Sequence, residues 1–358
     1  MPRLTLLLTF AALAFAACHG PSPEPSPAPA RDWAIAIHGG AGHFGEEDLS
    51  ADLQARYTAS LDAALAHGES LLASGAPAPD VVEAVIRILE DDSLFNAGRG
   101  AVYTAEATHE LDASIADGAT RNCGAVTGLS GFRHPISVAR GVMDSSEHVF
   151  FSGDGAAEFA RLMKAEAAPA AWFHTDKAYA RYQRAAARAG MLPPPAEPAV
   201  EKPLDKNGTV GCVVWDMRGH LAAGTSTGGM TFKRHGRIGD SPVIGAGTWA
   251  DDRTCAISAT GWGEFFIRTG VAQDIHSRML HGGASLAEAC RGAIFEEMGA
   301  LGGDGGVVAV DGAGNLALVF NSTGMFRAWA GPGERGVSMF GLEENGTIEE
   351  HPTPEAHD

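Results

Sequence analysis

The chain has 358 residues, of which 45% are apolar and 20% charged, so it has the composition of a globular protein with a sizeable core. Its 26 basic and 44 acidic residues give a formal net charge of −18, and no prominent cluster of Lys and Arg follows the first residues. This balance argues against nucleic acid and anionic membrane surfaces as partners.

Residues 1–17 have the build of a secretory signal peptide, with one Arg, a short apolar run and small residues before Cys18. The apolar run is too short to span a membrane. The segment "AFAAC" also resembles a bacterial lipobox, in which Cys18 carries a lipid anchor, although Phe15 is less usual there than Leu. Residues 18–32 form a Pro-rich tether. We therefore expect export to the periplasm, with Cys18 as a possible membrane anchor.

The first elements after the tether are predicted from apolar periodicity. Trp33 to His38 predicts a buried strand that runs into the glycine-rich turn "GGAG". Residues 50–75 and 78–92 each predict a helix with one apolar face, the second with Asp80 as N-cap and Glu83 completing a capping box.

Further strands and helices follow the same patterns in blocks rather than in strict alternation, which favours helices outside antiparallel sheets. Four cysteines remain after Cys18, without CxxC spacing, and their apolar surroundings favour buried free thiols. Strands are predicted over 109–118, 123–132, 209–216, 221–227, 241–250, 254–261, 305–311 and 315–322, and helices over 154–168, 176–190, 263–282 and 285–301.

Residues 191–208 contain five prolines and show no periodicity. A loop of this length inside a compact domain is normally functional or disordered. It ends abruptly at Thr209, where the predicted hairpin 209–227 begins.

The hairpin contains two candidate nucleophiles. Ser226 lies in "GTSTG", which matches the GxSxG pattern of serine hydrolases, but that pattern requires a strand-to-helix turn and the residues after it are rich in glycine. Thr209 follows Gly208, and a threonine at a chain terminus can use its own α-amino group, which titrates near ~8, as the base. A Gly-Thr pair alone is a weak signal, so both alternatives stay open on these residues.

Nine segments decide between them: "IHGGAG", "LFNAGRGAV", "HELDASIADG", "GTVG", "STGGM", "GRIGDSPVIGAG", "TGWGEFFIR", "GGDGG" and "FNSTGMFRAW". Their identity and order, between residues 33 and 330, resemble the isoaspartyl peptidase/asparaginase family of N-terminal-nucleophile hydrolases. The resemblance implies an α+β fold, a four-layer αββα sandwich. It also implies a precursor that cuts itself between Gly208 and Thr209. Residues 33–208 then form the α subunit, with 190–208 as a flexible linker, and residues 209–358 the β subunit of an (αβ)2 assembly.

The resemblance also assigns catalytic roles. Thr209 is the expected nucleophile, and Thr227 lies beside it and shares its hydrogen bonding. Thr260 and Gly261 match the oxyanion hole, which supplies one hydroxyl and one backbone N–H, and Asn96 faces the nucleophile. Hydrogen bonds to a developing oxyanion are commonly worth ~3 kcal/mol each.

The expected substrates, β-aspartyl dipeptides and L-asparagine, carry both charges of an amino acid. The resemblance assigns the α-carboxylate to Arg237, whose guanidinium can bind it in a fork, and the α-ammonium to Asp240. It places the remaining substrate contacts at Ile238, Gly239, Thr260, Gly261, Trp262 and Gly263.

No cofactor is expected for catalysis, but a family loop binds a structural sodium ion through backbone carbonyls. The matched positions are Leu89, Glu90, Asp92, Phe95, Ala97 and Arg99.

Trp262 departs from the small or polar residues common at its position, which suggests a preference for apolar leaving groups or packing alone. Two alternative functions remain. Glycosylasparaginases share "GTxG" and a run close to "FKRHGRIGDSP", and an exported binding lipoprotein could keep the fold without activity.

Overall fold

The computed structural model describes residues 33–193, 208–331 and 334–341. The expected signal peptide, the tether with Cys18, and positions 194–207 of the expected linker lie outside the described residues. The described residues all belong to one compact unit, and the boundaries expected for the two subunits stay predictions.

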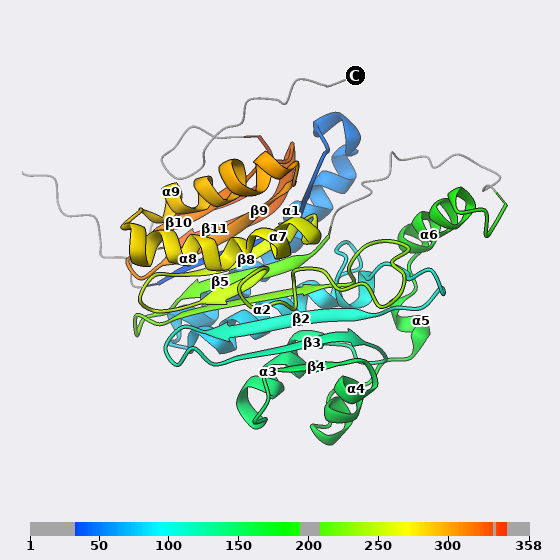
Figure 1. Cartoon of the computed structure of the whole chain (residues 1–358), viewed down its shortest axis with the longest axis horizontal. Coiled ribbons are helices and arrows are strands. Elements are labelled where there is room, and N and C mark those ends of the chain that lie inside the picture. Colours follow the sequence, from blue (N-terminus) through cyan, green and yellow to red (C-terminus); the bar gives the residue numbers. More distant parts are fainter. Residues whose placement is uncertain (1–32, 194–207, 332–333, 342–358) are drawn as a thin grey trace, which may run out of the picture. The chain divides into compact units, whose positions relative to one another are not determined.

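Two β-sheets form the centre of this unit (Figure 1). The larger sheet has eight strands in the order β12-β11-β1-β5-β6-β2-β3-β4, and the smaller has four in the order β10-β9-β8-β7. Neighbouring strands are antiparallel except for the parallel pair β3 and β4. The strands are β1 (Ala34–Gly42), β2 (Leu111–Asp117), β3 (Cys123–Leu129), β4 (Phe150–Ser152), β5 (Val210–Trp215), β6 (Leu221–Thr227), β7 (Thr248–Ala250), β8 (Cys255–Gly261), β9 (Gly305–Asp311), β10 (Leu316–Phe320), β11 (Gly324–Gly331) and β12 (Glu334–Phe340).

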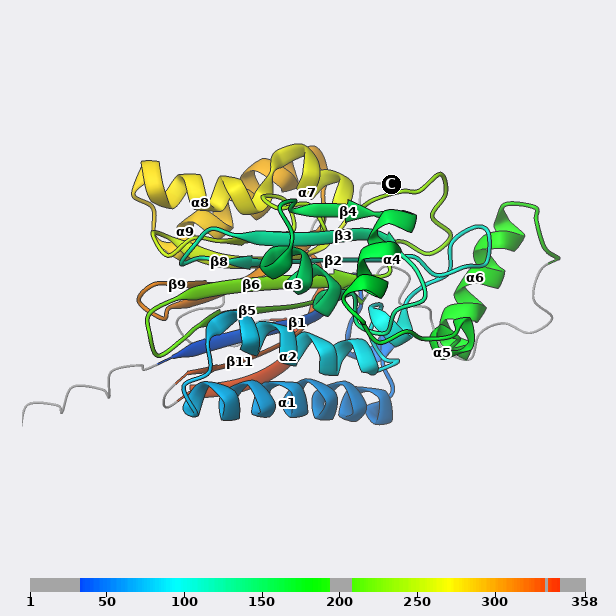
Figure 2. The same ribbon diagram turned by 90° about the horizontal axis from the view of Figure 1, so that it is seen from below.

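Helices cover the outer face of each sheet. Figure 2 shows α1 and α2 lying along the strands of the larger sheet, with α3 and α4 beside them, whereas α8 and α9 cover the smaller sheet. The confirmed αββα sandwich therefore has four layers. The helices are α1 (Ala51–Ala73), α2 (Ala78–Asp91), α3 (Pro135–Ser145), α4 (Gly153–Leu162), α5 (Ala170–Phe173), α6 (Asp176–Arg188), α7 (Gly263–Thr269), α8 (Val271–Gly282) and α9 (Leu286–Arg291), which continues as a π-helical segment (Gly292–Met298).

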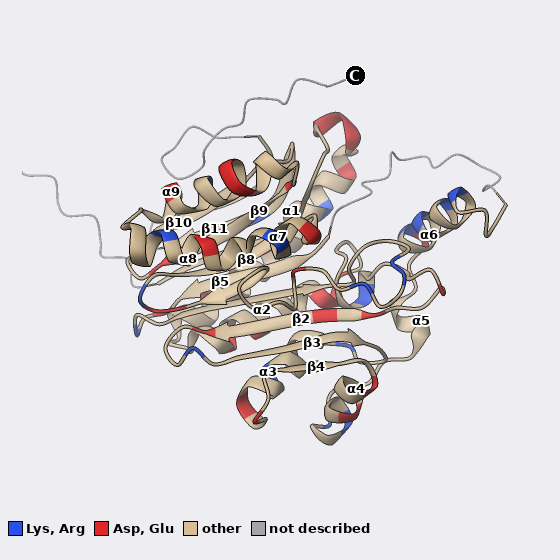
Figure 3. Ribbon diagram, viewed as in Figure 1, with Lys and Arg blue, Asp and Glu red and all other residues tan. Residues whose placement is uncertain are grey.

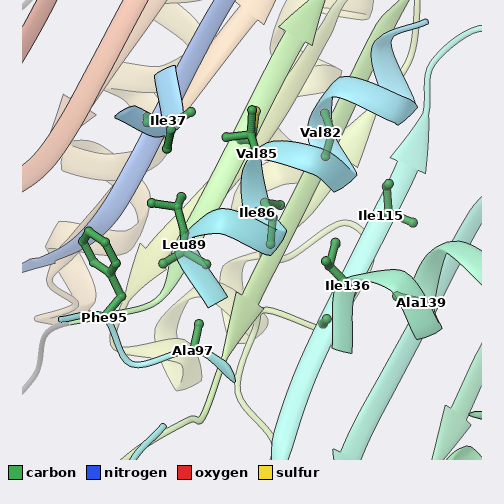
Figure 4. Packing of buried hydrophobic residues seen from close by; sticks show 14 of the residues in the cluster. Ile37, Val82, Val85, Ile86, Leu89, Phe95, Ala97, Ile115, Ile136 and Ala139 are labelled. Carbon is green, nitrogen blue, oxygen red and sulfur yellow. The ribbon is translucent and has the colours of Figure 1, made fainter. Parts of the chain in front are cut away.

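Strand alternation explains the layers. Successive side chains of a strand point to opposite faces, so Ile35 and Ile37 of β1 pack under α1 and α2, whereas Ala34 and Ala36 face the smaller sheet. Figure 4 shows Ile37 with Val85 and other residues of the helix-side cluster. Charged residues gather on helices and loops, while the four strands of the smaller sheet carry only Asp311 (Figure 3). The core is thus mainly apolar on both faces of each sheet, with a few buried polar side chains among the apolar ones.

Several local predictions need correction. The "GGAG" turn belongs to β1, which continues to Gly42 with a register shift between His38 and Gly40. Asp80 does not cap α2, because the helix already begins at Ala78, and the backbone N–H of Ala78 donates to Asp216 Oδ2 at 2.9 Å. The predicted helix 263–282 is broken into α7 and α8 at Gly270, whose φ is 60°.

Other predictions were incomplete. Only Thr248–Ala250 of the expected strand 241–250 is a strand, and the sequence does not predict α3, β4, α5, β11 or β12. The capping box of Ser285 and Glu288 at α9 is confirmed.

The four described cysteines are free thiols, of which Cys123 is only half-buried and Cys212, Cys255 and Cys290 are buried. Burial raises the pKa of each of these thiols. Within the described ranges, no helix is long and apolar enough to cross a membrane.

Candidate active site

The β5–β6 hairpin brings the expected nucleophile to one end of the larger sheet. Thr209 immediately precedes β5 and Thr227 ends β6, and the antiparallel register pairs Val210 with Ser226, so the two threonines are neighbours. The hydroxyl of Thr209 donates to Thr227 Oγ1 at 3.0 Å, and the backbone N–H of Gly229 donates to the same oxygen at 3.0 Å. Thr227 is therefore held in place to orient the Thr209 hydroxyl.

Gly208 and Asn96 pack together in front of Thr209. Gly208 has a φ of 139°, and a Cβ built on it would overlap the backbone N and the Cβ of Asn96. Only glycine fits this conformation and this close approach. The Asn96 side chain donates to the Gly229 carbonyl at 2.7 Å and accepts from the Val102 N–H at 2.9 Å. The residue before the expected cleavage point is thus fixed by its surroundings.

His38 lies beside Thr209 but does not have the geometry of its base. Its Nδ1 is 3.1 Å from the Thr209 carbonyl oxygen, and its Nε2 is 2.9 Å from Ser258 Oγ. Complete burial lowers the pKa of His38 to about 3, so the ring is neutral at working pH. Since the contact is to the carbonyl and not to the hydroxyl, a threonine–histidine dyad is excluded in this arrangement.

The expected oxyanion hole lies at the end of β8. Thr260 is buried, and its Oγ1 accepts from the Ala41 N–H at 3.3 Å, which leaves its own hydroxyl proton to donate. Gly261 has a φ of 152°, and a Cβ there would overlap the Asp304 carbonyl. The Trp262 N–H donates to that same carbonyl at 2.9 Å, so the backbone of this turn is fixed.

Asp240 is a buried carboxylate with one oxygen that lacks a hydrogen bond in the described part of the chain. It is 5% exposed, and its Oδ2 has no hydrogen-bond partner among the described residues. Burial raises the pKa of Asp240 to about 7. A Cβ on Gly263 would lie only 2.7 Å from Asp240 Oδ1, so glycine at 263 makes room for the carboxylate. An ammonium group fits the unpaired oxygen.

Arg237 is expected to bind the substrate α-carboxylate with its guanidinium, but one edge of the guanidinium already binds another side chain. Its Nε and Nη2 donate to the two carboxylate oxygens of Glu264, at 2.9 and 2.7 Å. This pair lowers the pKa of Glu264. The edge formed by Nη1 and the second proton of Nη2 remains for a substrate carboxylate. Glu264 was not predicted as a site residue, since nothing local in "GEFFIR" indicates that it reaches Arg237.

One cavity of about 100 Å³, open at its mouth, is lined by most of the expected residues. Thr260, Gly263, Gly208 and Ile238 are not among its lining residues, and Ile238 is 43% exposed. Sequence reasoning missed six lining positions, including Arg181 of α6, for which no local signal exists. The expected residues that line the cavity are Asn96, Thr209, Thr227, Arg237, Gly239, Asp240, Gly261 and Trp262, and the additional ones are Val102, Arg181, Gly229, Met230, Thr231 and Ser241.

Ser226 faces away from this cavity. It belongs to the helix side of β6, where its hydroxyl donates to Glu90 Oε1 of α2 at 2.6 Å, and it is 0% exposed. No strand-to-helix turn follows it, since β6 ends at Thr227. The GxSxG alternative is therefore wrong.

The loop expected to bind sodium follows α2. A Cβ on Gly98 would overlap the Glu90 carbonyl, and one on Gly100 would overlap the Phe95 carbonyl. These two carbonyls thus pack closely against glycines of the loop, and Asp92 uses its side chain for Leu94 N–H and Ser60. Oxygen ligands of this kind suit a hard cation such as sodium, so the residues present fit the ion.

Comparisons with known proteins agree with this geometry. The sequence profile of the family described as asparaginase matches residues 31–338. The chain is 46% identical to isoaspartyl peptidase of Escherichia coli (strain K12) over 317 residues, covering 88% of this chain and 98% of that protein. It is 48% identical to isoaspartyl peptidase of Salmonella typhimurium over 302 residues, covering 84% and 96%. It is also 43% identical to probable isoaspartyl peptidase/L-asparaginase 2 of Arabidopsis thaliana, covering 83% and 95%.

The structure has the αββα sandwich, with a threonine just before a central strand and a buried acidic residue in the same cavity. The sequence also matches the family profile over nearly the whole described chain. On these grounds the chain belongs to the asparaginase family of N-terminal-nucleophile hydrolases.

Proposed function

We propose that this protein cuts its own chain between Gly208 and Thr209 and then hydrolyses β-aspartyl dipeptides and L-asparagine through a Thr209 acyl-enzyme. One observation supports this more than any other: the Thr209 hydroxyl, the unpaired Asp240 carboxylate and the Arg237 guanidinium line the same cavity. These groups suit a substrate with an ammonium, a carboxylate and a reactive side-chain carbonyl.

Self-cleavage begins with addition of the Thr209 hydroxyl oxygen to the Gly208 carbonyl carbon. The Gly208–Thr209 C–N bond then breaks, and the hydroxyl proton ends on the nitrogen, which becomes a free α-amino group. Water hydrolyses the remaining ester and releases Gly208 as a carboxylate. The positive φ of Gly208 and its packing against Asn96 hold the scissile peptide in one conformation for this attack.

Substrate hydrolysis uses the new amino group. It accepts the Thr209 hydroxyl proton while Oγ1 bonds to the β-carbonyl carbon of the substrate, and the Thr260 hydroxyl and Gly261 N–H stabilise the oxyanion. The C–N bond breaks, and the leaving amine takes the proton. Water then hydrolyses the ester and releases aspartate. Asp240 and Arg237 orient the substrate throughout by its α-ammonium and α-carboxylate.

A denaturing gel with N-terminal sequencing tests the first step. We expect two chains, one beginning Thr-Val-Gly, and an intact, inactive chain for Thr209→Ala. Uncut wild-type protein after prolonged incubation, or an active Thr209→Ala variant, would refute the proposal.

Product release tests the substrate. We expect Leu from β-Asp-Leu and ammonia from Asn, both abolished in Thr209→Ala. Cleavage of glycosylasparagine in preference to both would replace this assignment by glycosylasparaginase activity.

We also propose that carbonyls of Leu89, Glu90, Asp92, Phe95, Ala97 and Arg99 hold a sodium ion. Its charge would stabilise the loop that carries Asn96. The melting temperature should then be higher in sodium chloride than in choline chloride at equal ionic strength, and equal values would remove the ion from the proposal.

Export and assembly are proposed on the sequence and the family resemblance. Residues 1–32 support a periplasmic protein, with Cys18 as a lipid anchor, and mass spectrometry of the mature N-terminus distinguishes cleavage alone from lipidation. An (αβ)2 assembly should give twice the mass of one αβ pair by light scattering.

A further inference from the structure

A buried row of polar side chains crosses the space between the two sheets, where facing residues are otherwise apolar. The row consists of His38 on β1, Ser258 on β8, Thr225 on β6, Thr248 on β7 and Ser114 on β2, each 0% exposed. They share a strand face with alanines of the inter-sheet cluster. Buried polar groups of this kind are costly unless they bond to one another.

The end of the row nearest the nucleophile is fully bonded. His38 Nδ1 contacts the Thr209 carbonyl at 3.1 Å and must donate, because a carbonyl oxygen only accepts. The neutral ring then has a lone pair on Nε2, which accepts from Ser258 Oγ at 2.9 Å. Ser258 Oγ lies 2.6 Å from Thr225 Oγ1. The Thr209 carbonyl thus selects the Nδ1–H tautomer, and this tautomer requires Ser258 to donate to Nε2. Thr225, whose hydroxyl also lies 3.0 Å from the Gly247 carbonyl, must then donate to Ser258.

The other end of the row reaches the substrate side of the cavity. Thr248 Oγ1 donates to Thr225 Oγ1 at 2.6 Å, and Ser114 Oγ lies 2.8 Å from Thr248 Oγ1. Ser114 Oγ is also 2.6 Å from the carbonyl of Ser241, the residue after Asp240. The row thus connects the backbone of the nucleophile to the backbone beside the buried carboxylate.

Gly211, the last residue of "GTVG", leaves room for the hydrogen bond between His38 and Ser258. A Cβ built on Gly211 would overlap both Ser258 Oγ and His38 Nε2. Both overlapping atoms belong to short side chains held by hydrogen bonds, so neither can move aside without losing one. A glycine two residues after the nucleophile is therefore explained by the His38–Ser258 hydrogen bond.

We propose that His38 is a positioning residue for Thr209 and that the hydroxyls of Ser258 and Thr225 hold it in the donating tautomer. The inference rests on the proposed function, since it takes Thr209 as the nucleophile. His38 anchors the Thr209 carbonyl, which fixes the direction of the hydroxyl and of the amino group made by cleavage. Loss of this anchor should slow the chemical step and leave substrate binding at Arg237 and Asp240 intact.

An isosteric pair of variants tests the proposal. Thr225→Val keeps the side-chain shape and removes the hydroxyl, whereas Thr225→Ser keeps the hydroxyl. For β-Asp-Leu we expect kcat to fall about tenfold or more in Thr225→Val and in Ser258→Ala, within the range known for small misplacements, with KM changed less than about twofold. Thr225→Ser should recover most of the loss. All rates are expressed per processed chain, counted from the Thr-Val-Gly terminus.

Thr254→Val is the matched control. It also deletes a buried hydroxyl bonded to a histidine, since Thr254 Oγ1 lies 2.6 Å from His276 Nδ1, but neither residue lines the cavity. We expect this control to have the kcat of the wild type. Each protein is assayed at the same number of degrees below its own melting temperature, so that a loss of stability does not count as a loss of activity. If the control loses as much kcat as Thr225→Val, or if Thr225→Ser is no better than Thr225→Val, the proposal is wrong.

Nitrogen NMR of ¹⁵N-histidine-labelled protein supplies a second readout. His38 should appear as the neutral Nδ1–H tautomer in the wild type, and its Nε2 signal should shift in Ser258→Ala. An Nε2–H tautomer in the wild type overturns the proposal. An active Thr209→Ala variant would instead refute the proposed function itself, so the two failures are distinguishable.

Discussion

Replacing Asp240 by Asn removes a carboxylate whose ionisation opposes folding of the substrate-free protein. Burial raises the pKa of Asp240 from 3.8 to about 7. At about 1.36 kcal/mol per pKa unit, ionisation of this buried group costs the folded state about 4 kcal/mol at alkaline pH. The carboxylate is nearly inaccessible to water, and its Oδ2 has no hydrogen-bond partner among the described residues, which explains the cost.

The sign of the pH dependence follows from proton binding. Because the folded pKa is higher than the unfolded one, the folded protein binds more protons between about pH 4 and pH 7. Stability therefore falls as pH rises through this window, by about 3 kcal/mol between pH 5 and pH 8 from Asp240 alone. With the average unfolding entropy per residue, this corresponds to about 4 °C in melting temperature.

Calorimetry at pH 5 and pH 8 measures the effect. In Asp240→Asn the Asp240 contribution to the pH dependence should vanish, while the KM for β-Asp-Leu rises because the substrate ammonium loses its partner. Added L-aspartate should raise the wild-type melting temperature but not that of the variant. Asp251→Asn is the control with opposite sign, because the side chain of Arg253 lowers the pKa of Asp251 and its loss should destabilise the protein at pH 8. An unchanged pH dependence in Asp240→Asn would refute the buried-charge reasoning.

Three further substitutions test separate features. Gly208→Ala should slow self-cleavage at least about tenfold, because the strain of a positive φ and the overlap with Asn96 cost on the order of 1–3 kcal/mol, and a time-resolved gel measures it. Ser226→Ala should retain kcat while lowering the free energy of unfolding by about 1–3 kcal/mol, since Glu90 loses a buried donor; an inactive but folded variant would restore the serine alternative. Trp262, 38% exposed at the cavity mouth, should favour apolar leaving groups, so Trp262→Thr should lower the ratio of kcat/KM for β-Asp-Leu to that for Asn, and an unchanged ratio would leave packing as its role.

Much of the fold followed from local patterns. The four-residue apolar spacing predicted α1, and the β-branched run after Thr209 predicted β5. The two C-terminal strands are not apparent from local patterns, because "GMFRAWAG" is apolar at nearly every position and shows no alternation. Helix α3 begins with Pro135 and contains Gly141, so its short apolar face gives only a weak helical pattern.

The candidate site was predictable wherever a residue's role depends on its immediate neighbours. Gly208 and Thr209 flank the proposed cleavage point, and position 208 requires glycine because its φ is 139°. Arg237 and Asp240 lie on one short loop, so their nearness needs no fold. The sequence predicts these features because they depend on backbone conformation and on the alternation of side chains in a strand. Both are determined by a few neighbouring residues.

Pairings between distant segments depended on the tertiary structure. Glu264 of α7 occupies the Arg237 fork, although the two residues are separated along the chain. His38 contacts the carbonyl of Thr209 across 171 residues of chain, because β1 lies beside β5. The raised pKa of Asp240 likewise arises from burial under the turn at Gly263. The burial of a side chain and the identity of its partners depend on how the layers pack. The spacing of residues along the chain does not specify which strands become neighbours.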